Sequence, residues 1–160
     1  MERIPPSEQI RQEISSLLSE GPPGQGSLLT QLVTKAIERV LQEALEQEQM
    51  DYLGRDHYER RSEEDPHRGY RNGYEPKRVK TAEGAIQVKM PQVRKGLEPY
   101  HSRVLPQAQR LTPSLERMVQ EMYARGLSPR DIEDLFQDAQ GPPLLSRTAV
   151  SEMTEALWKE

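Results

Sequence analysis

The side chains best suited to chemistry in this chain are cationic, and they gather in one segment. Residues 68–95 hold eight Lys and Arg against two Asp and Glu, although the whole chain has a net charge of −4. Ammonium and guanidinium groups bind the phosphates of a nucleic-acid backbone, and the local concentration of charge matters more than the net charge. The segment is therefore a candidate polyanion-binding surface inside an acidic chain.

The same segment alternates between polar and apolar residues. Two runs, residues 78–81 and 86–90, flank a turn at 82–85, which predicts a two-stranded β-hairpin whose second strand ends at Pro91. One face would carry Val79, Ile86, Val88 and Met90, and the other Arg78, Lys80, Gln87 and Lys89. An isolated hairpin is marginally stable in water, so the apolar face needs a helix or a partner.

The polar face of this hairpin has two interpretations. It is either an ordinary solvated strand face or a ribbon that lies on a phosphate backbone. In the second interpretation, further cations extend along the rim. They are Arg68, Arg71, Lys77, Arg94 and Lys95.

A second candidate surface follows from three helices expected within residues 112–158. The first begins at Thr112-Pro113 and ends at Gly126, and Ser128 with Asp131 forms a capping box at the start of the second. So short a turn makes the two helices cross sharply, as in a helix-turn-helix. The expected core positions are Leu115, Met118, Val119 and Met122 in the first helix, and Ile132, Leu135 and Phe136 in the second.

The third helix of this unit follows Gly141-Pro142-Pro143, with Ser146 as its cap. Its inner face would carry Ala149, Val150, Met153, Ala156 and Leu157, and its outer face Arg147, Thr148, Ser151, Glu152, Glu155 and Lys159. Arg147, Thr148 and Ser151 are candidates for base contacts, because such side chains reach base edges in the major groove. A plain packing unit is the alternative, since the connection before Ser146 is long and phosphates would repel Glu152 and Glu155.

The N-terminal part is acidic and helical. We expect an amphipathic helix over residues 7–19, a Pro/Gly linker at 21–26, and a long helix from Ser27 to Gly54. The apolar stripe of the long helix runs through residues 29–45 and then fades into a Glu/Gln run. It either docks on the rest of this chain or joins a second copy, which would make the protein a homo-oligomer.

Composition and motifs exclude several classes of protein. There is no cysteine, so disulfide scaffolds and thiol catalysis are excluded. No apolar run has the length of a membrane span, and the first residues lack the apolar core of a secretory signal. His57 and His67 have no third ligand at a zinc-like spacing, so we expect them to be solvated. Neither a Ser–His pair nor a Gly-rich phosphate loop is recognisable, and we expect a cytoplasmic protein.

These elements predict a mostly α fold with a small β-hairpin. The chain is 34% hydrophobic and 30% charged, a composition that favours small modules over one thick core. The expected segments are 1–26, a helix and linker; 27–54, the long helix; 55–67, a charged loop; 68–95, the hairpin; 96–111, a linker; and 112–160, the helix-turn-helix-like unit.

Several strings, in this order, resemble a known family. They are Tyr70-Arg71-Asn72-Gly73-Tyr74, then Lys80-Thr81 and Gly84 of the hairpin, then Tyr123-Ala124-Arg125-Gly126 with Ser128 and Arg130-Asp131-Ile132, and then Ser146-Arg147-Thr148-Ala149-Val150-Ser151. Over residues 29–160 they resemble the N-terminal half of mutator-type bacterial insertion-sequence transposases. The resemblance implies binding of double-stranded DNA at terminal inverted repeats, during transposition in the bacterial nucleoid, with no membrane partner.

The resemblance also implies a catalytic domain that holds Mg²⁺ on an Asp-Asp-Glu triad. In the family the first of these carboxylates comes after the helix that ends here near Trp158. We therefore expect no catalytic residue, metal or cofactor within this chain, and a structural role for Asp131 and Asp134. The chain is either a fragment of the enzyme or a truncated copy that competes with it without strand transfer. A protein-interaction module and, least favoured, an intact small enzyme are the alternatives.

Overall fold

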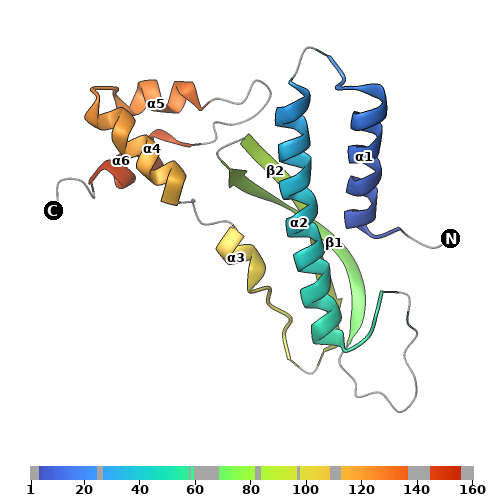
Figure 1. The fold of residues 1–160 in the computed structure, drawn as a ribbon. Coiled ribbons are helices and arrows are strands. Elements are labelled where there is room, and N and C mark those ends of the chain that lie inside the picture. The colour runs from blue at the N-terminus through green and yellow to red at the C-terminus, as the bar shows by residue number, and fades with distance from the viewer. Residues whose placement is uncertain are drawn as a thin grey trace. The chain divides into compact units, whose positions relative to one another are not determined.

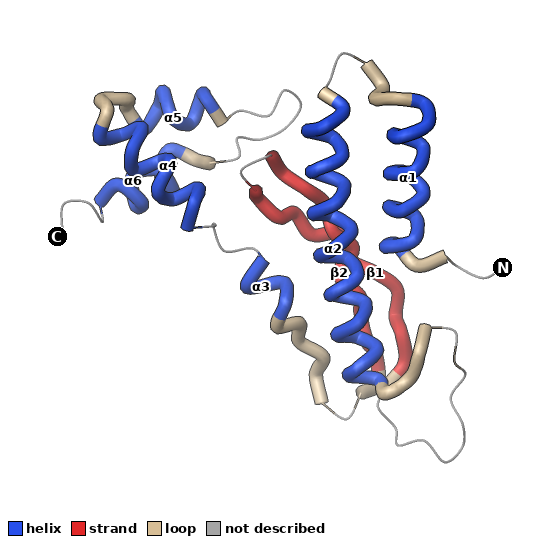
Figure 2. Tube along the Cα trace, in the orientation of Figure 1, coloured by secondary structure: helices blue, strands red, loops and turns tan. Residues whose placement is uncertain are grey.

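The computed structural model describes residues 4–24, 27–57, 59, 69–81, 84–96, 98–108, 113–136 and 145–155. Within these ranges the chain forms helices and one two-stranded hairpin, which confirms the mostly α fold class (Figures 1 and 2). It divides into two compact units. The first comprises residues 1–79 and 87–109, and the second residues 80–86 and 110–160.

Two helices, α1 (Pro6–Glu20) and α2 (Leu28–Leu53), pack along each other in the first unit (Figure 1). Gly54 ends α2 in the left-handed conformation, with φ 67°, as its type and position predict. The Ser7 backbone N–H and Oγ both donate to the Glu46 carboxylate, at 3.1 and 2.6 Å. An anion at a helix N-terminus is stabilising, so Glu46 fixes the start of α1 against α2.

The burial along α2 reverses what its sequence suggests. In the apolar N-terminal half, Leu29 is 71% exposed and Val40 65% exposed. In the polar C-terminal half, Gln42, Glu46 and Gln49 are all buried. The face of α2 that packs on its own chain is therefore partly polar, and much of the apolar stripe is left uncovered.

The hairpin pairs β1 (Tyr70–Thr81) with β2 (Gly84–Arg94) and is longer than predicted. Val79, Ile86, Val88 and Met90 are buried, as their alternation indicates. The expectation that Pro91 ends the second strand is wrong, because β2 continues to Arg94. An edge strand directs every second N–H away from its partner, so it accommodates proline more readily than a central strand does.

Glutamine side chains of α2 cover the outer edge of β2. The Gln42 amide donates to the Lys89 carbonyl at 2.9 Å and accepts from the Lys89 N–H at 2.8 Å. The Gln49 amide donates to the Gln92 carbonyl at 2.9 Å. Gln42 and Gln49 are seven residues apart, which is a rise of about 10.5 Å along a helix. Their partners Lys89 and Gln92 are three residues apart, which is about 10 Å along a strand, so the two spacings match. The helix thereby satisfies backbone groups that an edge strand otherwise exposes.

The first unit also contains α3 (Val104–Ala108), which packs against α2. The Glu48 carboxylate accepts hydrogen bonds from the Ser102 hydroxyl and the Arg103 N–H, just before this short helix begins. Glu46 and Glu48 of one helix thus hold the starts of two others, which links α1, α2 and α3.

The second unit contains α4 (Pro113–Ala124), α5 (Pro129–Leu135) and α6 (Arg147–Glu155). Its core is formed by Leu115, Val119, Ile132, Leu145 and Val150. The core positions predicted for Met118 and Leu135 are wrong, because these side chains are 40% and 61% exposed. Leu145, which precedes α6, is fully buried and is part of this core, a role that the helical pattern did not assign to it. Ala156, Leu157 and Lys159 lie outside the described residues.

Candidate nucleic-acid interface

The predicted cations of the hairpin do not form one uniform group. The Lys80 and Lys89 side chains are exposed, whereas Arg78 is half-buried. The Lys89 Nζ donates to the Gln9 side chain at 3.1 Å, so the backbone of Lys89 is held by α2 and its ammonium group touches α1. Arg68 lies outside the described residues. The Lys80 and Lys89 side chains therefore lie on the exposed side that the alternation predicts.

Arg71 has a different environment from the exposed rim that its position suggests. It is half-buried at the start of β1, and its Nη2 donates to the Arg55 carbonyl at 2.9 Å. Arg55 in turn donates from Nη2 to the Gly69 carbonyl at 2.7 Å. Burial lowers the pKa of Arg71, and the charge of Arg55 lowers it further, against the opposing effects of Tyr74 and Asp56.

Arg55 is a site residue that sequence reasoning missed, because residues 55–67 were interpreted as a charged loop. Its guanidinium lies 5.8 Å from the centre of the Tyr70 ring, in cation–π geometry. The alternating strand pattern gives no signal for such a contact, since Arg55 comes before the hairpin in the sequence. Only the fold brings it to the first residues of β1.

Gly69 closes this end of the hairpin. Its φ is 101°, and a Cβ atom there would lie 2.8 Å from the Arg94 carbonyl oxygen and 2.9 Å from the Gly96 nitrogen. Only glycine fits such a close backbone approach. The backbone of Arg94 therefore runs against Gly69, and the exposed side chains of Arg94 and Lys95 belong to the same end of the hairpin.

The start of α6 carries the three predicted base contacts. Arg147 and Thr148 are exposed, and Ser151 is half-buried. The Glu133 carboxylate of α5 accepts from the Arg147 backbone N–H at 3.1 Å, and its second oxygen lies 3.5 Å from the Arg147 Nε. The Glu133 carboxylate thus contacts both the backbone of the first turn of α6 and the Arg147 side chain. Glu152 and Glu155 are exposed on the same helix.

The Asp131 carboxylate at the start of α5 has a structural role. Asp131 forms the predicted capping box: its carboxylate accepts from the Ser128 N–H at 2.9 Å and from the Ser128 hydroxyl at 2.6 Å. These hydrogen bonds lower the pKa of Asp131. Across the described residues, no group of three or more His, Asp and Glu side chains is arranged to hold a metal ion.

Of His57 and His67, the structure describes His57 alone. His57 is half-buried, and its Nε2 lies 3.5 Å from the Tyr74 hydroxyl. Burial and the charge of Arg71 lower the pKa of His57. His67 lies outside the described residues.

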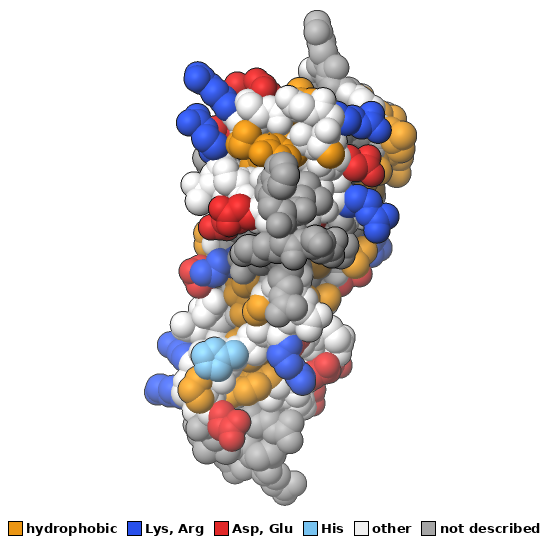
Figure 3. Space-filling view, turned by 90° about the vertical axis from the view of Figure 1, so that its left-hand side faces the viewer, with side chains coloured by type: hydrophobic (Ala, Val, Ile, Leu, Met, Phe, Trp, Pro, Cys, Tyr) orange, Lys and Arg blue, Asp and Glu red, His pale blue; other side chains and the backbone are white. Residues whose placement is uncertain are grey.

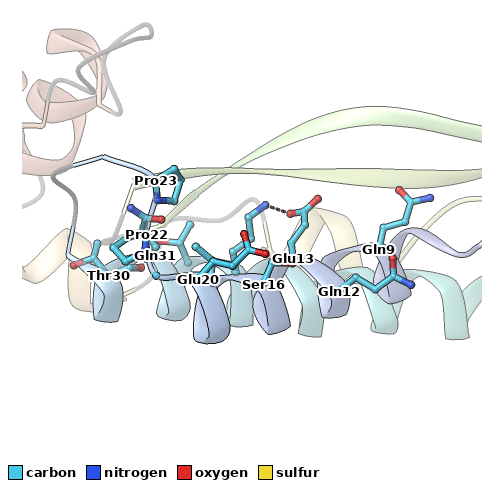
Figure 4. A pocket seen from close by; sticks show the side chains of 13 residues that line it. Gln9, Gln12, Glu13, Ser16, Glu20, Pro22, Pro23, Thr30 and Gln31 are labelled. Carbon is cyan, nitrogen blue, oxygen red and sulfur yellow. Dashed lines mark hydrogen bonds and ion pairs between the residues drawn. The ribbon is translucent and has the colours of Figure 1, made fainter.

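On the face drawn in Figure 3, Lys and Arg are interspersed with Asp and Glu. A groove of about 850 Å³ lies between α1 and α2, and it is lined mostly by neutral and acidic side chains (Figure 4). Its one cation, Lys35, is paired with Glu13 at 2.6 Å. None of the helices in the described ranges has the length and apolar sequence that a membrane crossing requires.

Known proteins provide independent comparisons. The family model "Transposase, Mutator family" matches residues 14–160. The transposase for insertion sequence element IS406 of Burkholderia multivorans is 31% identical over 153 residues, which cover 91% of this chain and 36% of that protein. The transposase for IS1201 of Lactobacillus helveticus is 29% identical over 113 residues, covering 71% of this chain and 30% of the relative. The transposase for IS256 in transposon Tn4001 of Staphylococcus aureus is 28% identical, covering 74% and 29%. The chain thus spans about a third of the length of these relatives.

Proposed function

Because the chain belongs to the mutator family of transposases, we propose that it serves transposition by binding double-stranded DNA at the terminal inverted repeats of an insertion sequence. The observation that carries the proposal is the exposed start of α6, which presents Arg147 and Thr148 from a three-helix unit with a short turn between α4 and α5. That arrangement suits a helix that reads base edges in the major groove.

We divide the contacts into two kinds. Arg147, Thr148 and Ser151 would read base edges, because arginine and hydroxyl side chains can distinguish base pairs there. Lys80 and Lys89 of the hairpin would contact phosphates, together with Arg78, and these contacts hold DNA without reading its sequence.

We propose no role in strand transfer for the described residues. Mg²⁺ would supply activation of the attacking and leaving oxygens in this family's chemistry. The described residues of this chain offer no set of carboxylates suited to it, so no catalytic step is derived from them. The proposal for this chain is DNA binding alone.

Removing the hairpin lysines is expected to weaken binding to every duplex. Each phosphate contact releases about one counterion, so a Lys80→Gln, Lys89→Gln double variant should lower the slope of log affinity against log salt by about two. Fluorescence anisotropy with a labelled duplex between low and moderate salt measures that slope. Arg39→Gln on α2 is the control, because its cation is already paired with Glu43 and lies outside the proposed interface. A wild-type chain whose binding to duplex shows no salt dependence would contradict the proposed function.

We further propose that the chain self-associates through α2. Leu29, Val33, Ala36 and Val40 are spaced four, three and four residues apart, and all four are exposed. This is the spacing of a helix seam that pairs with a second helix. The stripe is part of the 29–45 segment singled out by its sequence.

Placing a charge in this stripe is expected to dissociate the oligomer. Val40→Glu should shift sedimentation toward the monomer, because a glutamate in the seam would be buried without a partner. Leu18→Glu on α1 is the matched control, since Leu18 is 65% exposed but lies outside the stripe. If the wild-type chain sediments as a monomer at tens of micromolar, the self-association proposal is wrong.

A further inference from the structure

The base of the hairpin brings together two arginines that form no ion pair with a carboxylate of the described residues, although the charge of Asp56 partly offsets that of Arg55 at Arg71. Arg55 and Arg71 each donate one hydrogen bond to a backbone carbonyl, at 2.7 and 2.9 Å. Within the described ranges, neither guanidinium has a carboxylate at ion-pairing distance, whereas Lys77, further along the same strand, is paired with Glu75. Two neighbouring cations therefore share one end of the hairpin.

Such an arrangement has a cost that an anion would remove. The Nε atoms of Arg55 and Arg71 are buried and have no hydrogen-bond partner. Each guanidinium carries five N–H donors, and among the described residues one hydrogen bond is formed in each case, so most of the donor capacity of this pair remains for a ligand. Like charges close together in partly buried surroundings are unfavourable unless an opposite charge approaches.

The surroundings hold the pair in place and add further cations. The Tyr70 ring lies under the Arg55 guanidinium, which limits its rotamers. Gly69 keeps the backbone of Arg94 in close contact, so the exposed Arg94 and Lys95 side chains are at the same end of the two strands. A planar guanidinium fork held in this way matches the oxygens of a phosphate.

We propose that Arg55 and Arg71, with Arg94 and Lys95 beside them, form an arginine corner that binds a backbone phosphate of DNA. The ligand is a phosphodiester, and the corner reads charge and geometry rather than base sequence. This inference rests on the proposed DNA binding. It places a phosphate-binding site at the open end of the hairpin, where β1 starts and β2 ends, whereas Lys80 lies near the turn.

The test compares charge removal at the corner with charge removal at a paired lysine. Arg71→Gln, and separately Arg94→Gln with Lys95→Gln, should lower the salt slope of duplex binding by about one and about two. Lys77→Gln should leave the slope unchanged, because Glu75 already neutralises that cation. The Arg94 and Lys95 side chains are exposed, so this double variant keeps the fold even if Arg71→Gln does not. Circular dichroism of each variant checks the fold.

A second measurement separates this inference from the proposed function. Inorganic phosphate is titrated into ¹⁵N-labelled full chain, with chloride at equal ionic strength as the control, while the arginine Nε–H resonances are followed. If no duplex binds, the proposed function is overturned, and selective shifts of Arg55 and Arg71 would then indicate a phosphate site that does not serve DNA binding. Duplex binding with unchanged slopes in both folded variants overturns the corner and leaves the proposed function standing. Phosphate-induced shifts together with unchanged duplex slopes would mean a free-phosphate site, which also overturns the assignment to DNA.

Discussion

A Gln42→Leu variant is expected to lose about 2–5 kcal/mol of unfolding free energy, although leucine has nearly the same size. Gln42 is fully buried, and its amide takes part in three hydrogen bonds. Two of them satisfy the N–H and the carbonyl of Lys89, and the third reaches the Glu46 carboxylate at 3.1 Å. Leucine would leave the N–H and the carbonyl of Lys89 without this partner, at about 1–3 kcal/mol each, whereas the Glu46 carboxylate keeps its hydrogen bonds from Ser7.

Urea unfolding of the full chain, followed by circular dichroism, measures this loss. Gln47→Leu is the matched control, because Gln47 is exposed on the same helix and bonds only to Asp51, one turn away. It should change the unfolding free energy by less than about 0.5 kcal/mol. Equal stability of the Gln42→Leu variant and the wild-type chain would show that water or a rearranged α2 satisfies the edge of β2.

The sequence predicted the elements whose signals are local. Ser128 and Asp131 make a capping box through atoms three residues apart, so the pattern of residue types is sufficient to identify it. Gly54 ends α2 for an equally local reason, since a left-handed residue is needed there. The alternation of Val79, Ile86 and Val88 indicated the buried side of the hairpin, because strand side chains point to opposite faces in turn.

The polar contacts between distant segments could not be predicted in this way. Gln49 lies in the Glu/Gln run and Gln42 is a polar position before it, and hydrophobic patterning assigns both to solvent. Their burial depends on backbone groups 47 residues from Gln42 and 43 residues from Gln49. Arg55 likewise acquires its place from carbonyl and ring partners in the hairpin. A hydrophobicity pattern indicates which residues avoid water. It does not indicate which side-chain amides form hydrogen bonds to the backbone of an edge strand instead of to water.

The two misplaced core residues have a related cause. Met118 and Leu135 both lie on their predicted stripes, yet the core of the second unit is completed by Leu145, which comes from outside a helix. A helical stripe is wider than the area that a small three-helix core can cover. Which of its residues are covered depends on the neighbouring segments.

Replacing Arg147 with glutamine is expected to reduce sequence discrimination by about ten- to a hundredfold, because a bidentate contact to a base distinguishes base pairs by about 1–3 kcal/mol. The measurement compares affinity for a sequence enriched from a random duplex pool with affinity for an unrelated duplex. Arg130→Gln is the control, since Arg130 is exposed but belongs to α5. It should leave the ratio of the two affinities unchanged. Equal weakening of both duplexes by Arg147→Gln would instead make Arg147 a phosphate contact.

The contact between Glu133 and Arg147 allows a second test of the role of Arg147 in DNA binding. Glu133→Gln keeps an oxygen that can accept from the Arg147 N–H, and it removes the charge 3.5 Å from the Arg147 Nε. Affinity for unrelated duplex should then rise about three- to tenfold at low salt, while discrimination falls, because the arginine is less neutralised and less firmly held. In an Arg147→Gln background the gain in affinity should largely disappear, which identifies Glu133 and Arg147 as coupled.

Glu152→Gln is the control, because it removes an exposed charge from the same helix. Its gain in affinity should be equal in the wild-type and Arg147→Gln backgrounds, since Glu152 would repel DNA independently of Arg147.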